Sequence, residues 1–231
     1  MSLIYDLARL AKSGLKAQQA AQRDWSPYLV HFTSYSAMKP IRKLLKNTSM
    51  CSATDVSRAL DVADAKSWEV VRSILSSPAQ ELQKHSPQAS EGIPDCVCLS
   101  QCSFPGLFGH SERFGRFGFV FNKLDIFNLG GRPCAYIDSA IYGWLDAMHD
   151  KDATAGALWR TTNVYRPAKT GKVQDFTVER EWRLFDDLPF KEYLQATIAP
   201  DCYRDVFQDL LHSQGLNVPV LPIDMLYDWG V

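Results

Sequence analysis

The sequence has no apolar run of about 18 residues, the length that a helix needs to cross a membrane. Its first residues also lack the basic and then apolar order of a secretory signal. With six cysteines among 231 residues, thiols are too sparse for a disulfide-rich scaffold. These absences exclude a small disulfide-bonded secreted protein and predict a cytoplasmic protein with reduced thiols and no membrane contact.

An excess of charge of one sign is also missing. The 25 basic and 26 acidic residues give a formal net charge of −1. A nucleic acid as partner or as acceptor substrate is therefore not indicated by the charge. Hydrophobic residues make up 46% of the chain and charged residues 22%, which is typical of a folded globular protein rather than a disordered one. The length favours a single domain over residues 1–231.

Several common catalytic and phosphate-binding motifs are absent as well. The sequence has no Gly-x-Ser-x-Gly turn of a serine hydrolase and no His-Glu-x-x-His zinc motif. It also has neither Gly-x-Gly-x-x-Gly nor Gly-Lys-Ser/Thr, the usual phosphate-binding loops. A site for a ligand or substrate must therefore be sought in less familiar patterns.

The order of apolar periodicities predicts an α+β fold, with N-terminal helices followed by a mixed or antiparallel strand-rich core. Residues 1–27 form a helical extension in this prediction, and the Pro- and Gly-punctuated segment 76–95 is a mobile loop. Helical spacing predicts helices over residues 2–23, 34–47, 55–85, 139–149, 150–160 and 200–213. Short apolar runs predict strands over residues 28–33, 96–100, 117–122, 133–137, 177–185 and 218–223.

The predicted strand at residues 178–185 holds the most informative pattern. Because side chains alternate along a strand, Glu179, Glu181 and Arg183 share one face. Two carboxylates about 7 Å apart repel each other unless a cation, a substrate or water lies between them. Two interpretations are open: a ligand site, or a solvated strand face whose arginines pair with neighbouring acids.

Two other segments offer ligand-binding groups. His31 lies in the first predicted strand, either as a core histidine or, with Thr33 on the same face, as an anchor for a polar ligand. The Gly- and Phe-rich segment 104–118 is either a plain loop before a strand or a loop that brings His110, Arg113 and Arg116 to a phosphate-bearing ligand.

A group of thiols in the sequence is a candidate metal site. Cys96, Cys98 and Cys102, with His110 beyond them, offer the ligand types of zinc. However, Cys-x-Cys in a strand places both thiols on one face, where cysteine behaves as a small buried apolar residue, and no second cysteine pair completes a ligand set. We therefore expect core cysteines and no metal.

Several segments in a fixed order resemble one family, the abortive-infection AbiGi-type proteins of bacterial phage defence. The similarity extends over roughly residues 28–185, and the segments are residues 29–33, residues 98–100 with Pro105 and His110, and residues 114–123, 131–137 and 179–183. The resemblance implies a phage-defence protein, in one version a non-catalytic, antitoxin-like module that binds a partner protein of the same defence system.

A more distant similarity is to ADP-ribosyltransferases, including DNA-modifying toxins of the DarT type. His31 matches their early-strand histidine, and Glu181, followed by Trp182, matches their late catalytic glutamate. This similarity implies NAD as cofactor and an ADP-ribosyltransferase-like fold. Glu181 would then stabilise the charge that develops as nicotinamide leaves, and Glu179 would position or deprotonate the acceptor. The remaining NAD contacts would come from Thr33, Tyr136, Arg113 and Arg116.

Overall fold

The computed structural model describes residues 26–33, 38, 53–84, 94–102, 107, 110–111, 114–164 and 180–224. The predicted helix over residues 2–23 therefore lies outside the described residues, as does the one over 34–47 apart from Met38. The helical extension 1–27 also lies outside them, except for its last two residues.

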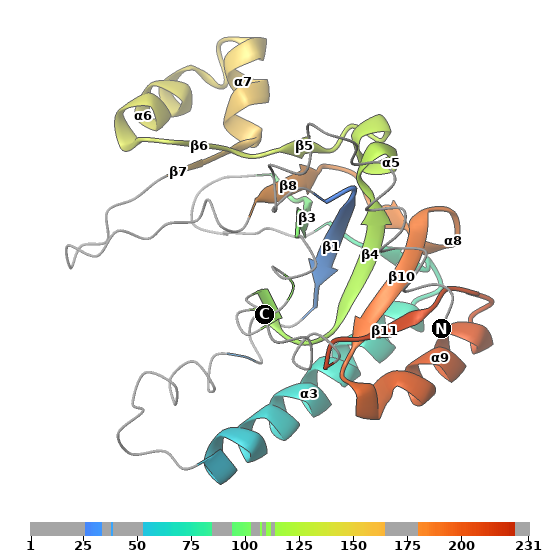
Figure 1. The fold of residues 1–231 in the computed structure, drawn as a ribbon. Coiled ribbons are helices and arrows are strands. Elements are labelled where there is room, and N and C mark those ends of the chain that lie inside the picture. The colour runs from blue at the N-terminus through green and yellow to red at the C-terminus, as the bar shows by residue number, and fades with distance from the viewer. Residues whose placement is uncertain are drawn as a thin grey trace, which may run out of the picture.

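The centre of the fold is a seven-stranded mixed sheet (Figure 1). Only its β10–β11 pair is parallel, and the other neighbouring strands in this sheet pair antiparallel. In spatial order the strands are β11 (Val220–Pro222), β10 (Leu194–Ala199), β4 (Gly118–Asn122), β1 (Tyr28–Phe32), β3 (Val97–Ser100), β8 (Glu181–Leu184) and β5 (Arg132–Pro133).

The described residues contain six α-helices, one 3-10 turn and two further two-stranded pairs. The α+β class is thus confirmed. The helices are α3 (Ala53–Leu75), α5 (Lys123–Asn128), α6 (Ser139–Met148), α7 (Ala153–Arg160), α8 (Phe190–Tyr193) and α9 (Arg204–Ser213). The 3-10 turn is η2 (Asp201–Tyr203), and the pairs are β2 (Glu81–Leu82) with β9 (Leu188–Pro189) and β6 (Ala135–Ile137) with β7 (Thr162–Val164).

The expected order, helices first and strands after, is wrong for the described part of the chain. β1 precedes every described helix, and five of the six helices follow β4. The physical reason is connectivity. The parallel pair β10–β11 needs a crossover, which α9 supplies. Helix α5 begins directly at the end of β4, where the Asn122 side chain accepts a hydrogen bond from the Leu124 amide and caps the helix.

The main hydrophobic core lies between one face of the sheet and helices α3 and α9 (Figure 1). Alternate strand residues face these helices and are almost completely buried. From the sheet they include Leu29, Leu99, Phe119, Phe121, Trp182 and Leu184, and from the helices Val71, Leu75, Phe207 and Leu211. Full burial of each large apolar side chain contributes about 1.5–3 kcal/mol, so this face dominates the stability of the fold.

A smaller apolar cluster covers part of the opposite face of the sheet. Its sheet residues are the alternate ones, Val30, Val120, Ala196 and Ile198, joined by Cys102, Leu107 and Ile223. The strict alternation of the two clusters along β1 and β4 means that neighbouring residues of one strand face different environments.

Residues 135–164 form a lobe that projects from the sheet edge next to β5 and β8 (Figure 1). Strands β6 and β7 pair in parallel, and α6 and α7 lie between them in the chain. The lobe has its own small core, which comprises Leu145, Ala155 and Trp159.

Some element boundaries differ from the predictions for local reasons. The strand predicted over 133–137 is two short strands in different sheets, because Cys134 interrupts it and its amide donates to the Glu181 carbonyl. The strand predicted over 177–185 is described from Glu181 onward. Before it, Arg180 has a φ of 42°, a left-handed conformation that does not extend a strand. The helix predicted over 55–85 ends at Leu75, shortly before Pro78.

The segment 76–95, expected as a mobile loop, is described at residues 76–84 and 94–95. It contains strand β2, in which Leu82 is buried in the main core. Among the described residues, no helix combines the length and apolarity that a bilayer crossing requires.

A glycine substitution tests the tight turn that follows α5. A Cβ on Gly131 would lie 2.5 Å from Ile126 Cγ2 and 2.9 Å from the Ile126 carbonyl oxygen, which is part of the backbone. We expect Gly131→Ala to lower the free energy of unfolding by about 1–3 kcal/mol, because the turn must shift. The measurement is urea denaturation of the purified protein.

The matched control is Gly143→Ala in α6, where a Cβ would meet no atom within 4 Å. Because alanine is the better helix former, this variant is expected to gain about 0.5–1 kcal/mol. Equal stability of the two variants would contradict the steric account of Gly131.

Candidate functional site

A pocket of about 560 Å³ lies beside the end of β1. Its walls come from the end of β1, the last turns of α3 and strand β2 with the residue after it. The polar side chains lining it are His31, Thr33, Ser73, Ser77, Glu81 and Gln83, and the apolar ones are Phe32, Val70, Ile74 and Leu82. This mixture of a few polar groups with an apolar wall is typical of sites for small organic ligands.

Helix periodicity accounts for the α3 wall. Val70, Ser73, Ile74 and Ser77 are spaced by three or four residues and therefore share one side of the helix and the turn that follows it. The neighbouring stripe, Val71 and Leu75, is fully buried against the sheet and fixes how the helix lies. The Ser73 hydroxyl is thus carried by α3 and the Ser77 hydroxyl by the turn that follows this helix, both beside β1.

Hydrogen bonds hold His31, in β1, and Thr33, the residue after β1. His31 Nδ1 lies 2.8 Å from the Cys98 carbonyl oxygen. A carbonyl can only accept, so Nδ1 is protonated, and in a neutral ring Nε2 is then the acceptor nitrogen. The Thr33 amide donates to the Phe117 carbonyl at 3.2 Å, which extends the β1–β4 pairing by one residue.

Glu181 lies elsewhere, in a bidentate ion pair with Arg183. Arg183 Nε donates to Glu181 Oε1 at 2.9 Å and Nη2 donates to Oε2 at 3.2 Å. The Arg183 side chain is 1% exposed, and its Nη1 donates to the carbonyls of Arg160 and Thr162 at 2.9 and 3.1 Å. Burial acts to lower the pKa of Arg183, whereas the charge of Glu181, its hydrogen bonds and the neighbouring thiols act to raise it, and together they keep this pKa above its ordinary value.

The strand register separates Glu181 from the pocket. Val30 lies opposite Ser100, and Ser100 lies opposite Glu181, so these three side chains share one face of the sheet. His31 is the neighbour of Val30 and faces the other way, toward α3. The structure therefore brings His31 and Thr33 together but places Glu181 on the opposite face.

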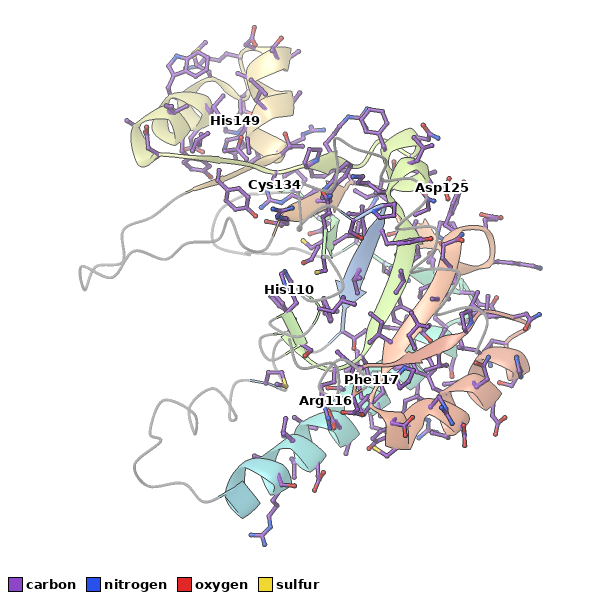
Figure 2. All side chains as sticks on the ribbon, viewed as in Figure 1. His110, Arg116, Phe117, Asp125, Cys134 and His149 are labelled. Atoms are coloured by element: carbon purple, nitrogen blue, oxygen red, sulfur yellow. The ribbon has the colours of Figure 1, made fainter. Side chains whose placement is uncertain are left out.

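Tyr136 and Arg116 also lie outside the pocket, and each contacts residues elsewhere. The Tyr136 hydroxyl accepts a hydrogen bond from the Glu181 amide at 3.1 Å, so this residue belongs to the Glu181 end of the sheet. Arg116 pairs with Asp64 and with Asp224, and it does not line the pocket. Figure 2 shows Arg116 near α3 and Cys134, the neighbour of Glu181, at the far end of the sheet.

The last two candidates, Glu179 and Arg113, lie outside the described residues. The pocket instead includes residues that the sequence did not indicate, chiefly Ser73, Ser77 and Glu81. A weak signal for the serines exists in their spacing of four on one helix side. Glu81 had no usable signal, because strand β2 was not predicted.

Cysteines surround the ion pair. Cys96, directly before β3, and Cys98, within it, have their sulfurs 3.7 Å apart. Cys134 is buried beside Glu181, and burial raises the pKa of its thiol well above the ordinary range. In the part of the chain that the structure describes, no three histidine, cysteine or acidic side chains gather so that they could hold a metal ion. No protein-family model matches this chain, and neither a curated protein nor a solved structure is found to be similar to it.

Proposed function

We propose that this protein is a component of a bacterial phage-defence system that binds a nucleotide of the NAD type in the pocket beside β1, without transferring ADP-ribose. One observation favours this function above others: His31 and Thr33, selected from the sequence as NAD-binding residues, line one pocket of about 560 Å³ with four further polar side chains. The defence role rests on the ordered resemblance of the sequence segments.

The chemistry of the lining favours the nucleoside part of such a ligand. Three hydroxyl groups and Gln83 can exchange hydrogen bonds with ribose hydroxyls, and Glu81 can accept from two of them. A carboxylate paired with ribose hydroxyls is a common arrangement in dinucleotide sites. Of the described residues that line the pocket, none is lysine or arginine, so the pyrophosphate is expected to lie outside.

Binding without transfer follows from the place of Glu181. A catalytic carboxylate must reach the nicotinamide ribose, but both oxygens of Glu181 contact Arg183 on the opposite face from His31. An ADP-ribosyltransferase-like site would need these two residues over one ligand. We therefore expect no release of nicotinamide from NAD by the purified protein.

Thermal unfolding with added ligand tests the proposal. A ligand that binds only the native state raises the midpoint, by an amount equivalent to about 2.7 kcal/mol at 100 times its Kd. We expect NAD at millimolar concentration to raise the midpoint, and the nucleosides adenosine and nicotinamide riboside to show which end enters the pocket. Ser77→Ala should weaken binding several-fold, because it removes a lining hydroxyl.

The matched control is Ser76→Ala, which removes the neighbouring hydroxyl of an exposed residue outside the pocket. Equal effects of the two serine variants, or no shift with NAD or either nucleoside, would contradict the proposal. Release of nicotinamide would restore the transferase hypothesis. Failure of every ligand would favour a partner-binding module, for which the lobe helices expose Ile141, Trp144 and Leu158.

A further inference from the structure

Cys96 and Cys98 form a close pair of thiols that is not part of the ligand pocket. Their sulfur atoms are 3.7 Å apart on the face of the sheet opposite to His31. Cys96 is fully buried, whereas Cys98 is partly exposed. Two thiols at this separation, one of them accessible, are arranged for conversion into a disulfide rather than only for packing.

The charges around the pair distinguish the two thiols. The hydrogen bond with Cys98 lowers the pKa of Cys96, and the positive charge of Arg183 adds to this effect against the opposing effect of burial. The same hydrogen bond and burial raise the pKa of Cys98. Cys96 is thus the sulfur that more readily becomes a thiolate, next to a partner that small molecules can reach.

We propose that Cys96 and Cys98 form a reversible disulfide when a hydroperoxide oxidises them, and that this bond alters the ligand pocket through the carbonyl of Cys98. The disulfide stands on the thiol geometry alone. Its effect on ligand binding rests on the proposed function of the pocket.

The reaction has two balanced steps. The accessible Cys98 thiol attacks a peroxide oxygen as it gives up its proton, an S–O bond forms and the O–O bond breaks, and the leaving oxygen takes up a proton and departs as water or an alcohol. The Cys96 thiolate then attacks the Cys98 sulfur, an S–S bond forms, and the hydroxide that leaves takes up a proton to become water. The two thiols lose two electrons and two protons, which the peroxide takes up.

The geometry of a strand allows a disulfide between Cys96 and Cys98, but only with strain. Residues two apart in a strand have Cα atoms about 6.6 Å apart, close to the upper end of about 6.8 Å found in disulfides. The sulfurs must approach from 3.7 Å to about 2 Å, which draws the two ends of the pair together. A bond formed under such strain is readily reduced again, as suits a reversible modification.

The link to the pocket is the His31–Cys98 hydrogen bond. Cys98 presents its sulfur to one face of the sheet while its carbonyl accepts from His31 Nδ1 at 2.8 Å. Bending β3 at Cys98 moves this carbonyl, and the His31 ring loses the bond that fixes its orientation and tautomer. One covalent change on the far face thereby reaches the pocket through a single backbone group.

Thiol counting tests the bond. The reduced full-length protein is treated with hydrogen peroxide, unfolded, and titrated for free thiols. We expect two of the six thiols to be lost and recovered with dithiothreitol, with an intact mass lower by two hydrogens. Cys96→Ser and Cys98→Ser should each abolish the paired loss. Cys102→Ser, Cys134→Ser and Cys202→Ser should each retain it, because these thiols lie outside the pair.

A paired loss that persists in Cys96→Ser or Cys98→Ser would overturn the proposal, as would oxygen addition without a disulfide. The link to His31 is read by long-range proton–nitrogen NMR of the imidazoles, with the His31 signals assigned from His31→Gln. We expect the Nδ1 and Nε2 signals of His31 to shift on oxidation and return on reduction. His149, which bonds Asp146 in the lobe, is the internal control and should not shift.

Ligand binding is measured last, so that two failures can be told apart. If NAD raises the midpoint of the reduced protein, we expect the oxidised protein to show a several-fold weaker response. An unchanged response, or an unshifted His31 in protein that contains the disulfide, would overturn the link to the pocket. If neither NAD nor a nucleoside binds even the reduced protein, the proposed function fails, while the mass and NMR results still decide the disulfide and its effect on His31.

Discussion

Replacing Arg183 by methionine is expected to lower the free energy of unfolding by about 3–5 kcal/mol, the usual effect of removing one partner of a buried ion pair. The guanidinium contacts both oxygens of Glu181 and two backbone carbonyls of the lobe, and it is 1% exposed. Methionine fills a similar volume, so the loss is electrostatic rather than a cavity effect. It leaves the Glu181 carboxylate without its cation in a mostly buried site.

Two comparison variants separate the ion pair from the lobe contacts. The double variant Arg183→Met with Glu181→Leu removes both charges and is expected to recover part of the loss, because a matched apolar pair is often as stable as a buried ion pair. Arg183→Lys retains the charge but loses the fork of parallel hydrogen bonds, so its loss should be intermediate. Urea denaturation gives all three values.

The lobe supplies a second measurement. Because Nη1 donates to the carbonyls of Arg160 and Thr162, Arg183→Met removes the side-chain link between β8 and the end of α7. Hydrogen exchange of the amides around residues 153–162 is therefore expected to accelerate more than that of β1 and β4. A loss below about 1 kcal/mol, or uniform exchange throughout, would contradict the role of Arg183 as a buried cross-link.

The sequence was most informative where local pattern and tertiary environment agree. β1 and β4 are central strands with apolar runs, and both were predicted to within one residue at each end. β10 is also central but was missed. In residues 190–199, Tyr193 and Leu194 follow Phe190 by three and four residues, whereas Ala196 follows Leu194 by two, so the spacing does not distinguish a strand from a helix. Its strand state is set by pairing with β4 and β11, which are distant in the sequence.

The candidate site shows the same limit. The alternation rule correctly put Glu181 and Arg183 on one face, but it could not show that Arg183 is itself the cation beside Glu181. The position of the Arg183 guanidinium depends on the lobe carbonyls that it contacts and on its burial. Both exist only in the assembled fold. Likewise, His31 and Thr33 were chosen for their shared face, whereas Ser77 and Glu81 join them only because α3 and β2 meet the end of β1.

Arg116→Met is the second substitution with a large expected effect, about 3 kcal/mol at neutral pH. Arg116 pairs with Asp64 on α3 and, at 3.1 Å, with Asp224 near the end of the described chain. Asp64 is 2% exposed, so its carboxylate would be left buried without a cation. The expected loss lies at the low end for buried pairs because the Arg116 side chain is 15% exposed and retains some water.

The loss should also depend on pH, in a direction set by Asp64. Burial raises the pKa of Asp64 above its ordinary value of 3.8, although the hydrogen bond and the charge of Arg116 act to lower it. A carboxyl whose pKa is raised by folding contributes stability below about 3.8, and this contribution is lost as the pH rises through the folded-state pKa. Removing Arg116 raises this pKa further. The deficit of Arg116→Met relative to the native protein should therefore be largest at neutral pH and shrink as Asp64 becomes protonated.

Asp64→Asn provides the control that isolates this group, because its side chain has no titrating proton. In an Asp64→Asn background, Arg116→Met should be milder at neutral pH, since no buried carboxylate is left unpaired. Most of the pH dependence of the deficit should also vanish, and the remainder comes from the more exposed Asp224. Unfolding free energies from urea titrations at a series of pH values give each term as a difference between two variants. If the deficit of Arg116→Met stays constant with pH in protein that retains Asp64, Arg116 stabilises the fold by packing its aliphatic stem rather than by neutralising Asp64.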